Sequence, residues 1–258
     1  MPTTSPAEHV YVYALIEGTL PSLPDVGMPE GGAPRAVPFA DNASLILSTV
    51  PSAIYSAAAI EPRLSDLDWV SSEGAAHHRV VDALASTPAV VVPFRLLSIF
   101  SSEAAAVATV RRMLPAIRRA FDRVRGREEW VLRIGKPDPA RRERAETPAS
   151  AASGTSFLAG KAAARREAAE RTERVKADAA ASYDALRKLA QEATTRPVDP
   201  SGTLLLDAAF LVAPAQVEPL RQALTVAADR LLHDGCAISL TGPWPPYSFA
   251  AVDTSADG

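Results

Sequence analysis

The sequence predicts an α+β protein built of two domains, and three features of the chain carry this prediction. Segments with the 3.6-residue apolar period of helices alternate with short β-branched and aromatic runs that are typical of strands. The 258 residues are enough for two domains, and 47% of them are hydrophobic, as in globular proteins. Gly126 follows an amphipathic segment near the middle of the chain. We therefore expect an N-terminal α+β domain over 1–126 and a second domain over 127–258.

The N-terminal half predicts three strands, a helix and a fourth strand. The first run, 9–16, is rich in β-branched and aromatic residues. Two short apolar runs, 35–39 and 43–50, are separated by a turn-favouring Asp-Asn pair and are expected to form a hairpin. An apolar stripe at helical spacing predicts a helix over 67–86, and a buried strand follows over 89–94.

A long amphipathic helix is predicted next, ending at Gly126. Ser101 or Ser102 is expected to cap its start, because a serine hydroxyl accepts a hydrogen bond from a free backbone N–H of the first turn. Pro115 lies inside the helix and is expected to kink it, since proline removes one backbone hydrogen bond. Its apolar residues recur at spacings of three and four: Val107, Val110, Leu114, Ile117, Phe121 and Val124.

The C-terminal half opens with a strand that alternates in polarity. Trp130 and Ile134 are expected to face the core, and Glu129 and Arg133 to face solvent. The predicted elements are a strand over 129–134, a long helix over 155–193, a strand over 204–212, a helix over 217–231 and a strand over 237–240. This β-α-β-α-β order suits a ferredoxin-like α+β layer.

The long helix over 155–193 stands out because it exceeds what a small domain needs. At 1.5 Å per residue it would reach nearly 60 Å. Its stripe keeps a near-heptad rhythm and predicts a coiled-coil-like extension: Ala164, Ala168, Val175, Ala179, Ser182, Leu186 and Leu189. We expect Ala168 and Val175 to meet a partner protein. The alternative is that a helix of the same chain covers the stripe.

Composition excludes several classes of function. The net charge of −3 lacks the basic excess of nucleic-acid binders. A single cysteine, Cys236, rules out an intramolecular disulfide and a thiolate metal cluster. The N-terminus has no signal-peptide pattern, and no apolar stretch approaches the roughly 20 residues of a membrane span. We expect a soluble, cytosolic protein.

No motif in the sequence predicts catalysis, a metal or a cofactor. His77 and His78 are adjacent, so on a helix they point about 100° apart and a solvated or core-edge role is favoured. The segment Gly154–Lys161 resembles a phosphate loop but has five residues between its glycines, and Ala162 replaces the Ser or Thr that would hold Mg²⁺. We read it as a helix start.

Two segments are not explained by solubility alone. Arg95 directly follows a buried strand, where it is expected to form a structural ion pair or to contact another protein. The segment Leu240–Phe249 combines prolines with three large aromatic residues, Trp244, Tyr247 and Phe249. It is expected either to cover the core at a domain seam or to form a rigid docking surface.

At these segments the chain resembles the GvpL/GvpF family of gas vesicle accessory proteins. Leu240–Phe249 is similar to the family's terminal LTGPWPPYSF signature. Further similar segments occur in the family's order along nearly the whole chain: Tyr11–Ile16, His77-His78, Val91–Arg95, Glu129-Trp130, Ser153–Leu158 and Phe210–Val212. Leu97 stands where the family usually has a glycine, and Phe157 and Phe210 replace tyrosines.

The resemblance implies an α+β N-terminal domain and a modified ferredoxin-like C-terminal domain with helical extensions. It also implies a role in gas vesicle formation, through binding to the major shell protein and to other accessory proteins, without enzymatic activity or cofactor. Two rival hypotheses remain open. One is a small-molecule-binding regulatory module with a polar pocket at a domain seam. The other is an enzyme built around His77, His78 and Arg95, which would need an acidic residue beside them in a deep cleft.

Overall fold

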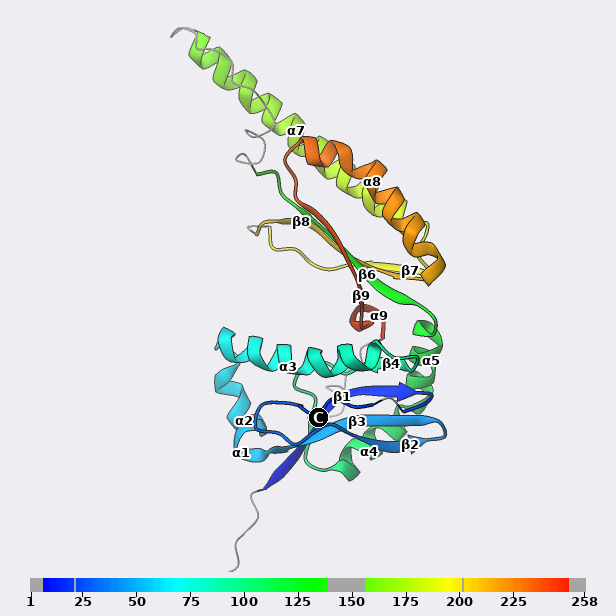
Figure 1. Ribbon diagram of the computed structural model, residues 1–258. Helices are drawn as coiled ribbons and strands as arrows, with labels where there is room; N and C mark the ends of the chain where they lie inside the picture. Colours follow the sequence, from blue (N-terminus) through cyan, green and yellow to red (C-terminus); the bar gives the residue numbers. More distant parts are fainter. Residues whose placement is uncertain (1–6, 21, 139–155, 201, 251–258) are drawn as a thin grey trace, which may run out of the picture. The chain divides into compact units, whose positions relative to one another are not determined.

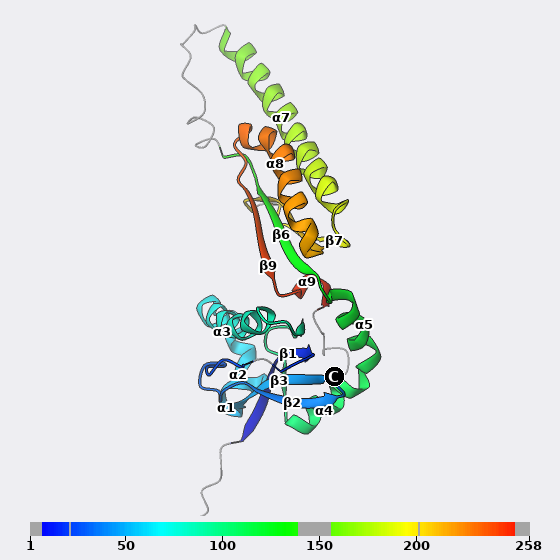
Figure 2. The same cartoon turned by 45° about the vertical axis from the view of Figure 1, so that its right-hand side comes forward.

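The computed structural model describes residues 7–20, 22–138, 156–200 and 202–250, with side chains in the helix that starts at residue 156 described from residue 165 on. The described residues form two compact units. Unit 1 contains residues 7–126 together with 244–250, and unit 2 contains residues 127–243 (Figures 1 and 2). Each unit is an antiparallel sheet with helices packed on it.

The sheet of unit 1 is organised around its first strand. The strand order is β2-β3-β1-β4, and β5 pairs with β1 beside β4. Every pairing is antiparallel. The four predicted strands and the hairpin are confirmed, with bounds β1 Glu8–Glu17, β2 Arg35–Ala40, β3 Ala43–Pro51 and β4 Val90–Pro93. The short strand β5 (Ile99–Phe100) was not predicted.

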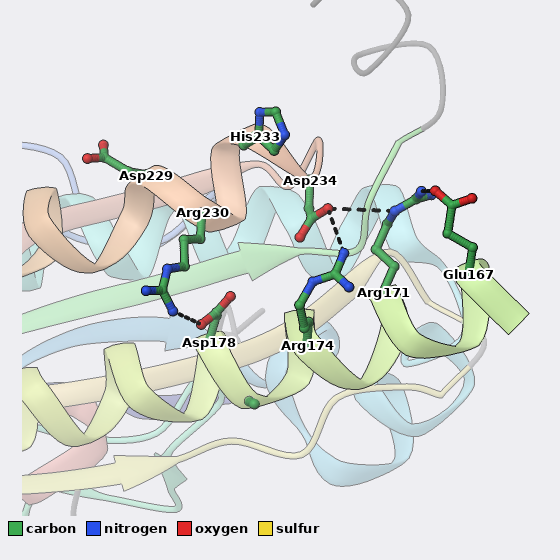
Figure 3. A pocket seen from close by; sticks show the side chains of 9 residues that line it. Glu167, Arg171, Arg174, Asp178, Asp229, Arg230, His233 and Asp234 are labelled. Carbon is green, nitrogen blue, oxygen red and sulfur yellow. Dashed lines mark hydrogen bonds and ion pairs between the residues drawn. The ribbon is translucent and has the colours of Figure 1, made fainter. Parts of the chain in front are cut away.

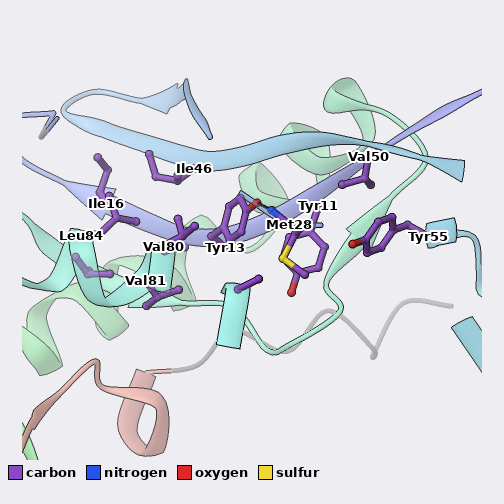
Figure 4. Packing of buried hydrophobic residues seen from close by; sticks show 13 residues of the cluster. Tyr11, Tyr13, Ile16, Met28, Ile46, Val50, Tyr55, Val80, Val81 and Leu84 are labelled. Carbon is purple, nitrogen blue, oxygen red and sulfur yellow. Dashed lines mark hydrogen bonds between the residues drawn. The ribbon is translucent and has the colours of Figure 1, made fainter. Parts of the chain in front are cut away.

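Helix α3 (Leu67–Ala85) packs on one face of this sheet. The Asp66 side chain caps its start by accepting hydrogen bonds from the backbone N–H groups of Asp68 and Trp69, each at 3.1 Å. Val80, Val81 and Leu84 enter the core beside tyrosines of β1, as Figure 4 shows. Three short elements precede α3 and were not predicted: α1 Ser52–Tyr55, α2 Ala57–Ile60 and η1 Glu61–Arg63.

The predicted single kinked helix is in fact two helices, α4 (Glu103–Arg112) and α5 (Leu114–Val124). Ser102 caps α4 by accepting a hydrogen bond from the Ala105 N–H at 3.2 Å, which settles the choice between the two serines. Met113 leaves the helical conformation, so Pro115 falls in the first turn of α5. The missing proline N–H has no helical partner there in any case, and a full break therefore replaces the expected kink.

Unit 2 is a four-stranded sheet in the order β7-β8-β6-β9, with α7 and α8 on one face. The helices pack against each other as well as on the sheet, which buries Val175, Leu186, Leu220 and Leu231 in one cluster. The elements are β6 Glu128–Gly135, α7 Ser156–Arg187, β7 Glu192–Thr195, β8 Leu204–Val212, η2 Pro214–Gln216, α8 Val217–His233 and β9 Ile238–Trp244.

Two expectations for unit 2 are wrong. The long helix ends at Arg187 rather than at residue 193, because the next residues turn and pair with β8 as strand β7. Glu129 was expected to face solvent, but its side chain is only 3% exposed. Strand β9 lies close to the backbone at this position, since a Cβ added at Gly242 would lie 2.8 Å from the Glu129 carbonyl oxygen.

The C-terminal segment differs from the expected domain assignment. Residues 244–250 group with unit 1, not with the second domain, because α9 (Tyr247–Ala250) packs against α5 and β4. The Arg123 guanidinium donates to the Phe249 carbonyl oxygen at 2.8 Å and lies 5.8 Å from the centre of its ring. Phe249 is 5% exposed and anchors the segment.

None of the helices in the described part of the chain is long and apolar enough to cross a membrane.

Candidate functional site

Unit 1 brings three of the singled-out segments together at one surface recess of about 370 Å³. His77 and His78 come from α3, Arg95 from the turn after β4, and Tyr247 from α9. Gly74 and Leu96 complete the lining. We call these six residues the signature recess. Sequence reasoning had named four of them separately but had not predicted that they meet.

The two histidines occupy different environments, as their position on one helix predicts. His77 is 3% exposed, and its Nδ1 lies 2.9 Å from the Tyr11 hydroxyl. Burial lowers the pKa of His77 to about 4, so the imidazole is neutral at pH 7. His78 is half-buried at the recess, with its ring 5.5 Å from that of Trp244 and 6.3 Å from that of Tyr247.

Arg95 is held by a turn whose backbone is fixed from both sides. The Ser98 hydroxyl donates to the Arg95 carbonyl oxygen at 2.8 Å, and the Leu97 N–H donates to the Tyr11 hydroxyl at 3.1 Å. Leu97 has a left-handed φ of 64°, which explains why glycine suits this position in similar sequences. The Arg95 side chain is exposed, and the structural ion pair or protein contact expected from the sequence stays a prediction.

The aromatic residues of the C-terminal segment divide between recess and core. Trp244 is 39% exposed and Tyr247 is half-buried, whereas Phe249 is buried. Phe249 thus belongs to the core of unit 1, while Trp244 presents part of its ring to solvent, and a docking role of this segment stays a prediction. Phe249 fixes α9 on unit 1, and this places Tyr247 in the recess and Trp244 beside His78.

A network of buried hydrogen bonds involves the face of α3 that packs on the sheet and the residues beneath it. The Tyr55 hydroxyl donates to the Glu73 carboxylate at 2.8 Å, and the Tyr13 hydroxyl donates to Ser48 Oγ at 3.0 Å. Burial raises the pKa of Glu73, and the hydrogen bond from Tyr55 partly opposes that rise. These bonds satisfy groups that would otherwise destabilise the core. Sequence analysis had treated the tyrosines only as strand formers.

The enzyme hypothesis needed an acidic residue beside His77, His78 and Arg95. The structure does bring those three residues together, but no Asp or Glu is among the described residues that line the recess. Glu73 contacts Tyr55 in the core instead. Among the described residues, no group of three or more His, Cys, Asp or Glu side chains has metal-binding geometry. Cys236 is buried, and burial raises its pKa to about 11, so it is a thiol at pH 7.

Unit 2 carries a second hollow of about 800 Å³ between α7 and α8, shown in Figure 3. Charged side chains of the two helices line it and pair with one another. Asp234 Oδ1 lies 3.6 Å from Arg171 Nε and 3.8 Å from Arg174 Nη2. Arg230 Nη1 lies 3.7 Å from Asp178 Oδ1. These pairs join the helices, so the hollow is lined by charges that already neutralise each other.

The two α7 residues expected to meet a partner lie in different environments. Val175 is 2% exposed and belongs to the core cluster of unit 2, so a helix of the same chain covers it. Ala168 is exposed. The start of the phosphate-loop-like segment Gly154–Lys161 lies outside the described residues, as do Ser153 and Thr155, either of which the sequence offers as the cap of this helix, while Ser156 to Lys161 belong to α7.

The comparison with protein families decides what kind of protein carries this recess. A family model described as "Gas vesicle synthesis protein GvpL/GvpF" matches residues 9–251. The chain belongs to the GvpL/GvpF family. It is also 31% identical over 255 residues to gas vesicle protein L of Streptomyces sp. (strain CB03234), covering 94% of this chain and 92% of that protein. GvpL/GvpF is a gas vesicle family and not a known enzyme family.

Solved structures of similar fold agree with the GvpL/GvpF assignment. The crystal structure of GvpF from Anabaena sp. PCC7120 has a TM-score of 0.66 at 15% identity, covering 95% of this chain and 97% of that one. GvpF from Microcystis aeruginosa gives 0.62 at 16% identity, covering 95% and 99%. The expected α+β fold is thereby confirmed, as two antiparallel sheets in a GvpF-like arrangement.

Proposed function

We propose that this GvpL/GvpF protein acts in gas vesicle assembly by binding the major shell protein and other vesicle accessory proteins, with no chemical step. The observation that carries the proposal is the family match over residues 9–251. A cytoplasmic location in association with vesicles follows from that role. The lining of the signature recess, which lacks a described acid to work with its histidines, agrees with binding rather than catalysis.

At the level of domains, we propose that unit 2 is a modified ferredoxin-like domain. Its described elements run β-α-β-β-α-β, and the first and third strands of the unit, β6 and β8, lie at the centre of the sheet. Its helix α7 has 32 residues against 17 in α8, so the N-terminal part of α7 extends past its helical neighbour. We propose that this part is the coiled-coil-like extension.

Exposure decides which predicted partner-binding residues remain in the proposal. Arg95 and Trp244 on unit 1 and Ala168 on α7 are exposed, and Tyr247 is half-buried at the recess. Val175 and Phe249 are buried in the cores of their own units. We therefore propose the first four as contact residues and leave the other two as structural.

The function is tested by pull-down of the major shell protein with the full chain. We expect capture in buffer with EDTA and without nucleotide, because nothing in the sequence or in the described residues predicts a phosphate or metal site. The matched cellular test is deletion of the gene, which should reduce vesicle yield. An absolute requirement for ATP or a divalent ion, or vesicle yield unchanged by the deletion, would contradict the proposal.

The extension of α7 is tested separately by placing a charge at an exposed position of this helix and, in a second variant, at a buried one. Ala168→Glu should leave the melting temperature unchanged and weaken partner binding, because the residue is exposed. Val175→Glu is the comparison variant, and it should destabilise unit 2 by burying a carboxylate in an apolar cluster. Full partner binding by Ala168→Glu would remove the extension from the proposed interface.

A further inference from the structure

Three charged side chains form a row across the sheet of unit 2, on the face turned away from α7 and α8. The register pairs Arg133 of β6 with Asp207 of β8, and the N–H of Arg196, which follows β7, donates to the Asp207 carbonyl oxygen at 2.8 Å. Their neighbours Leu132 and Ala208 belong to the cluster under the helices, and successive side chains of a strand point to opposite faces. We call Arg133, Asp207 and Arg196 the arginine row.

The arginine row holds more positive than negative charge. Each oxygen of its one carboxylate faces one arginine: Asp207 Oδ2 lies 3.3 Å from Arg133 Nε, and Oδ1 lies 3.4 Å from Arg196 Nε. Two guanidiniums against one carboxylate leave one positive charge in excess. The side chain of Arg133 is 47% exposed and that of Arg196 is 38% exposed, whereas that of Asp207 is 13% exposed. The excess charge therefore lies on the two side chains that solvent reaches.

One donor of the row also lacks an acceptor. Arg196 Nε faces Asp207, but Arg196 Nη2 is buried and makes no hydrogen bond within the described part of the chain. Nearly all buried polar groups of folded proteins have a hydrogen-bond partner, and an exception often marks the place of a water or an ion. A buried donor on a charged group is especially costly to leave unsatisfied. This donor therefore indicates an acceptor that comes from outside the described residues.

We propose that the arginine row binds the carboxylate of an Asp or Glu side chain of a partner protein. The inference rests on the proposed function only for which protein carries that side chain. A guanidinium presents its N–H donors in a planar fork that fits both oxygens of a carboxylate. One further carboxylate neutralises the row, whereas a phosphate dianion would place surplus negative charge beside Asp207. The charge balance thus favours a carboxylate over a phosphate.

The sheet holds the arginine row in place before a ligand binds. β6 and β8 are its central strands, and the backbone of Arg196 is bonded to that of Asp207. Side chains positioned by strands lose less freedom on binding than side chains on loops. The adjacent cross-strand row consists of Thr194, Ala209 and Val131, none of which carries a charge. No carboxylate of that adjacent row competes with a ligand for the two arginines.

The inference is tested by nuclear magnetic resonance on the full chain labelled with ¹⁵N-arginine, which reports on the Nε–H group of each arginine. The probes are inorganic phosphate and two peptides blocked at both ends, acetyl-Ala-Thr-Glu-Thr-Ala-amide and the same peptide with Gln in place of Glu. We expect the glutamate peptide to shift the Nε signals of Arg133 and Arg196 in a saturable way. The glutamine peptide should bind at least about tenfold more weakly, because it lacks the charge. Phosphate should bind no more tightly than the glutamate peptide.

Variants of the row locate the contact. Arg133→Lys and Arg196→Lys assign the two signals. Arg133→Gln and Arg196→Gln should each weaken binding of the glutamate peptide about tenfold, read from the arginine that remains, since each variant removes one fork. Arg187→Gln is the matched control, because it removes an exposed arginine at the end of α7 and should change nothing. Asp207→Asn raises the positive charge of the row, so its affinity for phosphate should rise relative to that for the glutamate peptide.

Five results would overturn the inference. They are equal affinity for the two peptides, wild-type binding by both glutamine variants, tighter binding of phosphate than of the glutamate peptide by the wild type, an unchanged ratio of these affinities in Asp207→Asn, and no saturable shift up to about 10 mM peptide. Failure of the proposed function is distinguishable from each of these. A chain whose arginine row binds the glutamate peptide, but which does not capture the shell protein, keeps the site and loses the proposed function. A chain that captures the shell protein while its arginine row binds neither peptide does the reverse.

Discussion

Unit 1 and unit 2 both pack helices on an antiparallel sheet, but the groups between helix and sheet differ in kind. The buried cluster of unit 1 contains Tyr11, Tyr13 and Tyr55, with Glu73 and His77 buried beside them. The buried cluster of unit 2 contains no tyrosine or histidine among the described residues, although Tyr183 packs against it, and the buried polar residues of this unit are Glu129 and Ser182. Charged side chains of unit 2 also form pairs outside its cluster: Asp234 and Asp178 lie near arginines of the helix pair, and Asp207 lies near arginines of the sheet.

This difference indicates a division of work. A network of buried hydrogen bonds holds α3 and the turn after β4 in one arrangement, because a buried polar group that is separated from its hydrogen-bond partner destabilises the folded state. Unit 1 therefore positions side chains accurately, and it carries the signature recess. An apolar cluster tolerates small shifts of its side chains better than a hydrogen-bond network does. The α7–α8 pair is held by such a cluster together with ion pairs between the two helices. Unit 2 supplies a stable base for the extended α7.

The largest expected effect tests how unit 1 holds the C-terminal segment. Phe249→Ala should reduce the free energy of unfolding by about 3–5 kcal/mol, since the ring is buried against α5 and α9 would lose its anchor. Trp244→Ala is the matched control in the same segment and should cost only about 1–2 kcal/mol, because the indole is 39% exposed. Chemical denaturation of both variants measures the two values. Equal losses would show that Trp244 is core and not a recess residue.

Much of unit 1 was predictable because its signals are local. The apolar period of α3, the β-branched run of β1 and the serine cap of α4 each lie within a few neighbouring residues. The recess was not predictable in this way. Arg95 and Tyr247 are far apart in the sequence, and only the packing of Phe249 on α5 places Tyr247 at the recess. No local pattern encodes that contact.

The wrong predictions in unit 2 also concern residues whose structure depends on contacts with distant parts of the chain. Strand β7 has the sequence Glu-Ala-Thr-Thr, which lacks an apolar alternation and forms because β8 offers its edge. Val175 had the spacing of an exposed interface stripe, and the chain itself covers it with neighbouring elements of unit 2. Alternation predicted that Glu129 faces solvent, but the residue is buried, and a period-two pattern on one strand does not show what the rest of the unit places over it.

A second prediction separates the units by their response to acid. The folded-state pKa of His77 is about 4, below the usual value of 6.5, so the unfolded chain binds the proton first as the pH falls. Unit 1 should lose about 2 kcal/mol of stability between pH 7 and pH 5 from this group. The raised pKa of Glu73 acts in the opposite direction, because a protonated carboxyl is tolerated in the core. The neighbouring His78 side chain adds to the lowering of the His77 pKa.

Hydrogen exchange between pH 5 and pH 7, read separately for amides of β1 and of β8, measures this difference after correction for intrinsic exchange rates. Protection should fall in β1 and change little in β8. His77→Gln serves as the control: it should flatten the pH dependence in unit 1 whatever it does to stability at pH 7. A dependence that survives in this variant would assign the acid response to another group.

The smallest expected effect concerns the ion pairs that join α7 to α8. Asp234→Asn removes the carboxylate that faces Arg171 and Arg174 (Figure 3). The Arg174 side chain is 58% exposed, whereas those of Asp234 and Arg171 are only 12% and 20% exposed. Solvent therefore screens the pair with Arg174 more than the pair with Arg171, and we expect a loss of about 1 kcal/mol. Asp229→Asn is the matched control, because Asp229 lines the same hollow without an ion pair among the described contacts. The measurement is the melting temperature of both variants at about 0.05 M and at about 1 M salt. Asp234→Asn should melt at a lower temperature than Asp229→Asn at the lower salt concentration, and the two melting temperatures should converge at the higher one, since salt screens exposed charges. A salt-independent loss of several kcal/mol would mean that Asp234 acts as a buried group, and the contrast between a polar core in unit 1 and polar surface pairs in unit 2 would fail.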